Sequence, residues 1–326
     1  MKRLKILYAV QRTGNGHIAR AQELIPIIEN YAHVDILASG SQAEIQLTKS
    51  LKFSFPGISL FYGKNGSLSY RKIIFKNNFF QFLKTIFQSN FSEYDLIIND
   101  FEPITAWYCK FHNTPIISLS HQSSLWFAET PKPDKNDFIA SIILVFYAPI
   151  KEKYGFHFKK YNSRIFTPVI RSKIRNLHPT ISEKHVVYLP AFTDEKIFST
   201  LNDIDTFWVV FSKNAKGKYQ NGNCTFYPIN ENEFITELES CKGVLCGAGF
   251  ELPSEALFLK KKLFVIPIKL QLEQEYNAKS LELLGVAVSS KLDKNKIKNW
   301  VHSEQNIKVD YPDESEEIIK RILNLL

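Results

Sequence analysis

Cysteine is scarce in this chain of 326 residues, and its spacing excludes two classes of site. The four cysteines form neither a C-x-x-C pair nor the framework of a small secreted protein. Cys241 and Cys246 flank a predicted buried strand, so we expect small core residues there, as we do at Cys109 and Cys224. This use of cysteine indicates a reducing cytoplasm.

Long hydrophobic runs are also missing. The longest, 138–150, is too short for the roughly 20 residues of a spanning helix, and Pro149 interrupts it. We interpret it as a buried strand or core helix. The N-terminal apolar stretch ends before Gln11 and Arg12, so it predicts a first buried strand and not a signal peptide.

Acidic residues are absent from 45–92, where seven Lys and Arg residues and nine Phe occur. A second basic stretch, 151–175, has Glu152 as its only acid, and the net charge is +8. Basic charge mixed with aromatics can indicate nucleic acid, an anionic membrane surface or an anionic ligand. Composition does not choose among them.

Continuous apolar strands alternate with helical patterns along both halves of the chain. We expect strands at 4–10, 33–38, 57–62, 94–99, 114–120, 185–190, 206–212, 242–247 and 263–267. We expect helices at 18–28, 41–50, 70–90, 102–112, 193–201, 230–239, from 251 onward and at 273–284. Such alternation is typical of parallel sheets covered on both faces. The predicted fold is α/β, with two Rossmann-like doubly wound parallel-sheet domains facing a cleft.

The predicted division places one Rossmann-like domain at 1–168 and the other at 169–312. The basic stretch around Thr167 and Pro168 indicates the linker between them. Residues 313–326 carry apolar side chains at helical spacing and predict an amphipathic closing helix.

The turn after the first strand reads T-G-N-G-H-I-A-R and carries Gly14, Asn15 and Gly16. Its glycines match the dinucleotide fingerprint G-x-G-x-x-A, which also requires an acid at the end of the second strand. The nearby acid, Asp35, lies inside that strand, so we disfavour NAD.

His17 follows these glycines at the expected start of a helix, at the ligand-binding edge of the sheet. A helix N-terminus disfavours the imidazolium, so we expect a neutral imidazole able to accept a proton from an attacking hydroxyl. The alternative is a histidine that only caps or packs.

Asp100 ends the fourth predicted strand, at the same edge as His17. A carboxylate on the far imidazole nitrogen would fix the tautomer. The alternative is a helix N-cap before Pro103. His121, after the next strand, is a weaker third member of this edge.

The second half carries a three-part series: L-C-G-A-G-F-E-L-P-S-E-A-L (245–257), V-I-P (265–267) and L-E-Q-E-Y-N-A (272–278). Gly247 and Gly249 let backbone N–H groups approach a diphosphate at a helix N-terminus. Glu255 comes one turn later, within reach of a ribose diol. Glu273 and Gln274 follow a strand end and can bond sugar hydroxyls.

Asp203 and Asp205 spell the D-x-D of metal-dependent glycosyl transfer, but they precede a strand, where turn acids are common. We expect no metal site and no cofactor apart from a nucleotide sugar as co-substrate.

The G-x-G-H-x-x-R opening and the GAGF, SEAL, VIP and EQEYNA segments resemble glycosyltransferase family 28, of GT-B architecture, which includes the enzyme that forms peptidoglycan lipid II. The resemblance covers about 6–285 and implies that 1–168 is the acceptor-binding domain and 169–312 the nucleotide-sugar-binding domain. It implies that Glu255 contacts the ribose, that Glu273 and Gln274 contact the donor sugar, and that His17 is the acceptor-side base. It assigns the diphosphate to the turn Gly247, Ala248, Gly249 and Phe250, and implies inversion at the anomeric carbon.

Two positions depart from the family pattern. Glu251 stands where many relatives have Thr or Ser beside the phosphates, and its charge would repel them unless turned away. The turn 189–193 lacks glycines that often help to hold the diphosphate.

The predicted function is therefore metal-independent transfer of a hexose from a nucleotide diphosphate, with UDP as the expected carrier. One rival is a UDP-sugar 2-epimerase of the same architecture. The other is a non-catalytic nucleotide-sugar binding protein. We expect no nucleic-acid partner. The expected location is the cytoplasm, with the inner face of the cell membrane as the alternative place.

The sequence does not decide what the basic Phe-rich segment 70–91 packs against. Phe75, Phe79, Phe82, Leu83 and Ile86 share one helical face, which core packing explains. Phe80 and Phe87 lie beside that stripe, among Arg71, Lys72, Lys76 and Lys84. This composition fits either a packed helix or contact with an anionic bilayer or a lipid-linked acceptor.

Overall fold

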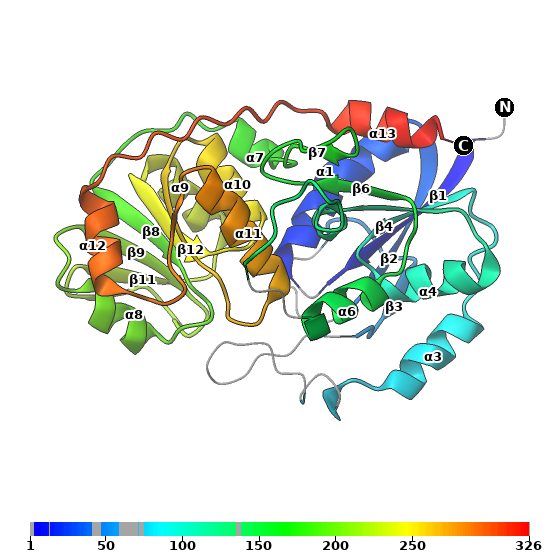
Figure 1. Cartoon of the computed structure of the whole chain (residues 1–326), viewed down its shortest axis with the longest axis horizontal. Helices are drawn as coiled ribbons and strands as arrows, with labels where there is room; N and C mark the ends of the chain where they lie inside the picture. Colours follow the sequence, from blue (N-terminus) through cyan, green and yellow to red (C-terminus); the bar gives the residue numbers. More distant parts are fainter. Residues whose placement is uncertain are drawn as a thin grey trace.

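The computed structural model describes residues 3–12, 14–40, 47–58, 71, 75–134 and 138–325. Two seven-stranded sheets divide these residues into a first half, which holds β1–β7, and a second half, which holds β8–β14. In Figure 1 the two halves lie side by side. The prediction of two Rossmann-like parallel-sheet units is confirmed.

All pairs in the first sheet are parallel, in the order β3-β2-β1-β4-β5-β6-β7. Its strands are β1 (Leu4–Gln11), β2 (Ala32–Ser39), β3 (Phe53–Phe55), β4 (Leu96–Asp100), β5 (Ile116–Ser120), β6 (Lys153–Phe156) and β7 (Ile165–Phe166). Its helices are α1 (Asn15–Glu29), α3 (Phe79–Gln88), α4 (Pro103–His112), α5 (His121–Ser124) and α6 (Phe138–Tyr147).

The second sheet has the order β10-β11-β9-β8-β12-β13-β14, parallel except for the edge strand β10. Its strands are β8 (Lys184–Tyr188), β9 (Phe207–Ser212), β10 (Tyr219–Asn221), β11 (Cys224–Pro228), β12 (Gly243–Gly247), β13 (Lys262–Ile266) and β14 (Ala287–Val288). The remaining helices are α7 (Ser172–Arg175), α8 (Asp194–Leu201), α9 (Glu231–Ser240), α10 (Glu251–Phe258), α11 (Leu272–Leu283), α12 (Lys294–His302) and α13 (Ser315–Leu323).

The strand order reverses between β1 and β4 in one sheet and between β8 and β12 in the other. Ligands bind beyond the carboxyl ends of the strands at such switch points. The loops that follow these four strands therefore mark where a ligand site is expected in each half.

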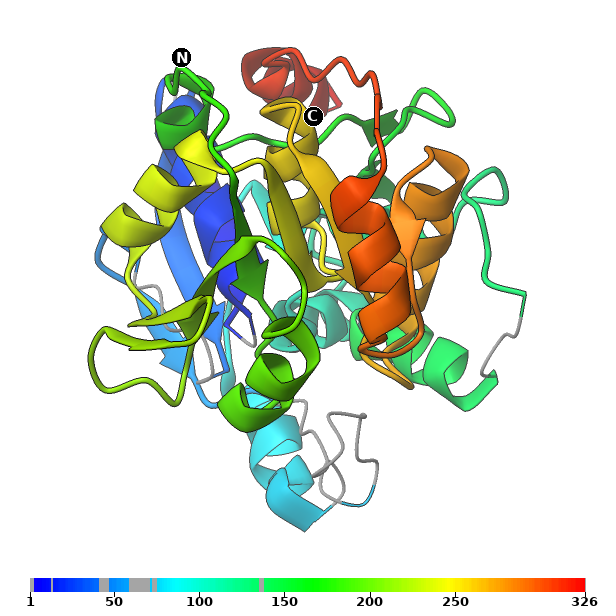
Figure 2. The ribbon, with the colours of Figure 1, turned by 90° about the vertical axis from the view of Figure 1, so that its left-hand side faces the viewer.

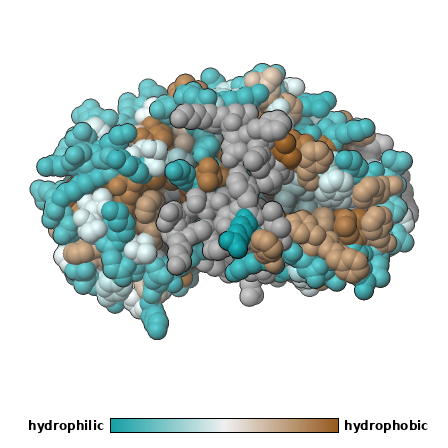
Figure 3. All heavy atoms as spheres, turned by 60° about the horizontal axis from the view of Figure 1, so that its bottom comes forward, coloured by the Kyte–Doolittle hydropathy of each residue, from teal (hydrophilic) through white to brown (hydrophobic). Residues whose placement is uncertain are grey.

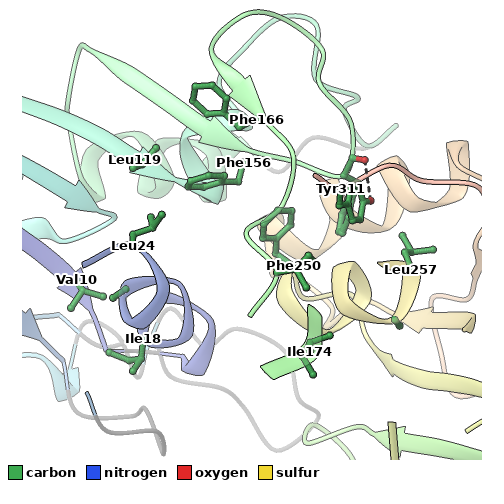
Figure 4. Packing of buried hydrophobic residues seen from close by; sticks show 14 of the residues in the cluster. Val10, Ile18, Leu24, Leu119, Phe156, Phe166, Ile174, Phe250, Leu257 and Tyr311 are labelled. Atoms are coloured by element: carbon green, nitrogen blue, oxygen red, sulfur yellow. Dashed lines mark hydrogen bonds between the residues drawn. The ribbon is translucent and has the colours of Figure 1, made fainter. Parts of the chain in front are cut away.

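One hydrophobic cluster runs through both halves, from Val10 and Leu24 to Leu257 and Ile322. In Figure 4, Phe250 of the second half lies between Phe156 of the first half and Leu257. The chain then returns to its starting half, because α13 packs on α1 and appears above it in Figure 1. The two halves are thus held by shared packing as well as by their linker.

Several expected elements differ from those in the structure. The third strand is Phe53–Phe55 and not 57–62, of which 59–62 lie outside the described residues. Residues 47–50 of the expected helix 41–50 are not helical, and 41–46 lie outside the described residues. Strands β6 and β7 and the β10–β11 hairpin were not predicted.

Two helices have exposed apolar faces. Phe75, Phe79 and Leu83 of the supposed core stripe are exposed, whereas Phe82 and Ile86 are buried. Part of α6 is also exposed, at Ile142, Val145 and Phe146, so the prediction of a core element was wrong for that face. In Figure 2, α3 projects from the bottom of the molecule. No helix within the described part of the chain is both long and apolar enough to span a membrane.

Candidate functional site

His17 lies in the first turn of α1, which begins after the extended N-cap residue Gly14. Its Nδ1 is 2.8 Å from Oδ1 of Asp100, the last residue of β4. Because Val10 of β1 pairs in register with Asp100, the two parallel strands deliver the imidazole and the carboxylate to one edge of the sheet. The structure thus contains the contact expected from the sequence, while the catalytic role of both residues stays a prediction. The alternative prediction, that Asp100 is the N-cap of the next helix, is wrong, because the side chain of Glu102 caps α4.

Arg20, one turn after His17, completes a buried charge cluster that we did not predict. Its Nε and Nη2 donate to the two oxygens of Asp100 at 2.9 and 2.8 Å. Burial alone would raise the pKa of Asp100, but the charge of Arg20 and the hydrogen bonds from His17 and Arg20 hold that pKa below its ordinary value. With Asp100 ionised, His17 donates from Nδ1 and keeps Nε2 available to accept a proton. The amide nitrogen of Gln122 lies 3.4 Å from Nε2.

A pocket of about 430 Å³ lies between the two halves, lined in the first half by the two residues that precede His17, whereas His17 and Asp100 are not among its lining residues. Asn15 and Gly16 form its wall in the first half. The second half contributes residues 188–192 at the end of β8 and just after it, Cys246, Gly247 and 249–253 around the start of α10, 266–269, Gln274, Ser290 and Lys291. The first turn of α10 has no side-chain cap, which suits a helix N-terminus that receives an anion.

Residues predicted to bind the donor fall into two groups in the structure. Gly247, Gly249, Phe250 and Gln274 line the pocket, together with Asn15 and Gly16 of the predicted acceptor-side loop. Gly14, Ala248, Glu255 and Glu273 are not among the lining residues of this pocket.

Glu255 is buried, and both of its oxygens accept from Arg171, at 2.6 and 2.8 Å. Arg171 comes from the segment between the two sheets and also pairs with Glu231 at 3.0 Å. The carboxylate expected at a ribose diol is therefore bonded to the linker, and the structure does not bring it to the pocket lining.

Direct contacts cross between the halves on one side of the pocket. Gln122 donates to Glu273 at 2.9 Å, and Nε2 of His121 lies 2.7 Å from Oδ1 of Asn277. The ring of Phe250 stacks on His121 with 3.9 Å between centroids. Burial lowers the pKa of His121 to about 3, so its role is an interface contact and not a proton acceptor near neutral pH.

The side-chain oxygen of Gln274 accepts a hydrogen bond from the backbone N–H of Ile268 at 2.9 Å. This bond fixes the loop after β13. Asn277, in the same helix, donates to the carbonyl of Ala248 and braces the glycine-rich loop. Asn277 and Gln122 were missed at the sequence level, although both stand beside predicted motif residues.

Asp203 bonds Lys294, on the far helix α12, and Asp203 and Asp205 do not line this pocket. In the described part of the chain, no three His, Cys, Asp or Glu side chains come together as a metal-ligand set. All four cysteines are buried and unpaired.

Two Rossmann-like halves that share an inter-half pocket, with a glycine-rich loop at a helix N-terminus, have the GT-B fold of solved glycosyltransferase structures. The family model for glycosyl transferase family 1 matches residues 4–303, and the chain belongs to this family. The finer resemblance to family 28 and its lipid II enzyme stays a prediction. No curated protein sequence matches the chain.

Solved structures agree on the fold. The glycotransferase of kitacinnamycin superposes with a TM-score of 0.61 at 10% identity, over 99% of this chain and 95% of that one. UGT2 of Phytolacca americana, complexed with UDP-2fluoro-glucose and pterostilbene, gives 0.58 at 11% identity, over 99% and 94%. MurG of Acinetobacter baumannii gives 0.54 at 12% identity, over 98% and 99%.

Proposed function

We propose that this protein transfers a hexose from a UDP-sugar to an acceptor hydroxyl, with inversion and without a metal. The observation that carries the proposal is that Asn15 and Gly16, which line the pocket at the start of α10, lead directly into His17, which is paired with Asp100. Membership of glycosyl transferase family 1 supports transfer chemistry, and the UDP-2fluoro-glucose in a structural neighbour supports the donor class.

In the proposed reaction, the acceptor oxygen attacks the anomeric carbon while the bond from that carbon to the diphosphate oxygen breaks. The acceptor proton passes to Nε2 of His17, and UDP leaves with the bonding electron pair. Asp100 holds the imidazole in the required tautomer. Backbone N–H groups at the start of α10 stabilise the charge that develops on UDP.

A calorimetric screen of nucleotide sugars, followed by incubation with the best ligand alone, tests the proposal against its rivals. A transferase is expected to leave the donor unchanged, apart from slow hydrolysis, until an acceptor hydroxyl is supplied. Formation of an epimerised UDP-sugar without acceptor would establish the epimerase. Binding without turnover towards any hydroxyl acceptor would support the non-catalytic alternative.

Glu255→Ala is expected to weaken UDP binding about tenfold or more if the carboxylate serves the ribose, because a charge-assisted hydrogen bond contributes about 1.5–3 kcal/mol. Glu231→Ala is the matched control, since it removes the other carboxylate on Arg171. Isothermal titration with UDP measures both. Equal losses in the two variants would show that Glu255 acts only by holding Arg171.

The proposed acceptor is lipid-linked and lies at an anionic membrane, which the first half meets through a continuous apolar and cationic face. Phe87 of α3 stacks on Phe111 of α4 at 5.7 Å, and Phe111 packs near Trp107 at 5.8 Å. The Trp107 indole donates to the carbonyl of Phe146 on α6 at 3.0 Å. Figure 3 shows hydrophobic side chains gathered on this side of the molecule.

Exposure and charge favour a bilayer over a packed core for this face. Phe75 and Phe80 are 78% and 79% exposed, which core packing does not explain. Lys110 lies over the Trp107 ring at 4.7 Å, and no acid occurs between residues 45 and 92. At the end of α6, Tyr147 stacks on Phe101, which follows Asp100 in the sequence. This contact connects the exposed apolar face to the His17–Asp100 pair.

The protein is expected to sediment with anionic vesicles at low salt, since each basic residue near the surface contributes about 1 kcal/mol. Charge reversal of Lys76, Lys84 and Lys110 to Glu should leave it in the supernatant. Charge reversal of Lys216, Lys298 and Lys308, exposed in the second half, is the matched control and should not. If the wild type stays in the supernatant at every lipid charge, a water-soluble acceptor becomes the better proposal.

A further inference from the structure

Glu251 is the first residue of α10, and its carboxylate lies at the end of the pocket where a diphosphate is proposed to bind. Its Oε1 accepts from Nη1 of Arg20 at 2.6 Å, across the gap between the halves. A Cβ at Gly16 would lie 2.2 Å from Oε2, so the glycine makes room for this carboxylate. The side chain is 28% exposed, which leaves it a path out of the contact.

Lys269 and Lys291 line the same pocket, but the charged side chains nearest to Glu251 do not favour a second anion. Asp100 and Glu251 are negative, Arg20 is positive, and His17 is neutral when it acts as a base. Among these four side chains, the negative charges therefore exceed the positive by one before a diphosphate arrives. A phosphate at the start of α10 would meet the Glu251 carboxylate at short range, where like charges repel strongly.

Arg20 offers the means to relieve this conflict. Its Nε and Nη2 are fixed on Asp100, whereas Nη1 donates to Glu251, which lines the pocket. Guanidinium groups bind phosphate oxygens as readily as carboxylates. Phosphate and carboxylate thus compete for one N–H group and one helix N-terminus.

We infer that Arg20 is a ligand of the donor's diphosphate, and that Glu251 occupies its place until the donor displaces it. Arg20 then joins the diphosphate to Asp100 and, through Asp100, to the base His17. The inference rests on the proposed function, because it assigns a nucleoside diphosphate to this pocket. It gives a role to the glutamate that departs from the Thr or Ser of similar sequences.

Calorimetry with UDP and with uridine tests this inference in the full-length protein. Glu251→Gln keeps the shape of the side chain and removes its charge, so UDP should bind about tenfold tighter while uridine affinity stays within twofold. Glu233→Gln, at an exposed acid in the first turn of α9, is the matched control and should change neither. In an Arg20→Lys background, which retains a charge beside Asp100 but loses the forked guanidinium, the gain from Glu251→Gln should fall to within twofold.

Unchanged or weaker UDP binding in Glu251→Gln would overturn the inference, as would an equal gain for uridine or a gain that persists with Lys at position 20. In each of these cases the protein still binds UDP, so the proposed function stands. Failure of every variant and of the wild type to bind UDP would overturn both.

Discussion

Replacing His17 with alanine is expected to lower turnover at least about a hundredfold and to leave UDP affinity within about twofold. A positioned general base contributes about 10²–10⁴-fold to a proton transfer. The donor pocket is formed mainly by the second half, so removing the imidazole changes the reaction step more than donor binding. Steady-state kinetics and UDP calorimetry on the same preparation separate the two effects.

The matched control is His33→Ala, because that imidazole is exposed on β2 and distant in sequence from the motif. Asp100→Asn should lower turnover in the same direction but by less, since the amide oxygen can still accept from Nδ1. A fall in UDP affinity as large as the fall in turnover would place His17 on the donor side. Near-normal turnover would reduce it to the capping or packing role.

The position of the His17–Asp100 pair could be predicted from the sequence because it depends on local rules. Each residue follows a continuous apolar strand, and the carboxyl ends of adjacent parallel strands meet at one edge. The same rules could have placed Arg20 beside His17, because residues three apart share a helix face, but the sequence analysis did not include its pairing with Asp100. The Gly222-Asn223 turn likewise carried an unused hairpin signal between β10 and β11.

The partner of Glu255 could not be predicted in this way. Arg171 precedes it by 84 residues and reaches it only because the linker passes beside α10 once the halves have packed together. The exposure of Phe75, Phe79 and Leu83 and of one face of α6 was not predicted, for a related reason. Helical periodicity shows that an apolar stripe exists, but not whether another element covers it. Long-range packing decides both cases.

Arg20→Leu is expected to lower the free energy of unfolding by about 3–5 kcal/mol, because it leaves the buried Asp100 carboxylate without its main counter-charge. Urea denaturation at neutral pH measures the loss. Lys5→Leu is the control, since its pair with Glu93 is exposed and should contribute little.

The loss in Arg20→Leu should also depend on pH with a definite sign. In the wild type the lowered pKa of Asp100 stabilises the fold above the ordinary carboxyl pKa of about 3.9, and this contribution disappears as the pH falls. Without Arg20, burial should instead raise that pKa, so the penalty is largest at neutral pH and shrinks as the carboxyl takes up a proton. The two stability curves should therefore approach each other in acid.

Neutralising the carboxylate provides the decisive comparison. Arg20→Leu combined with Asp100→Asn should be more stable at neutral pH than Arg20→Leu alone, since the unpaired buried charge is gone. This recovery should vanish in acid, where Asp100 is protonated in the single variant. If Arg20→Leu loses no more stability than Lys5→Leu, or if the double variant is the less stable one, the Asp100 charge does not depend on Arg20, and His17 alone would have to satisfy it.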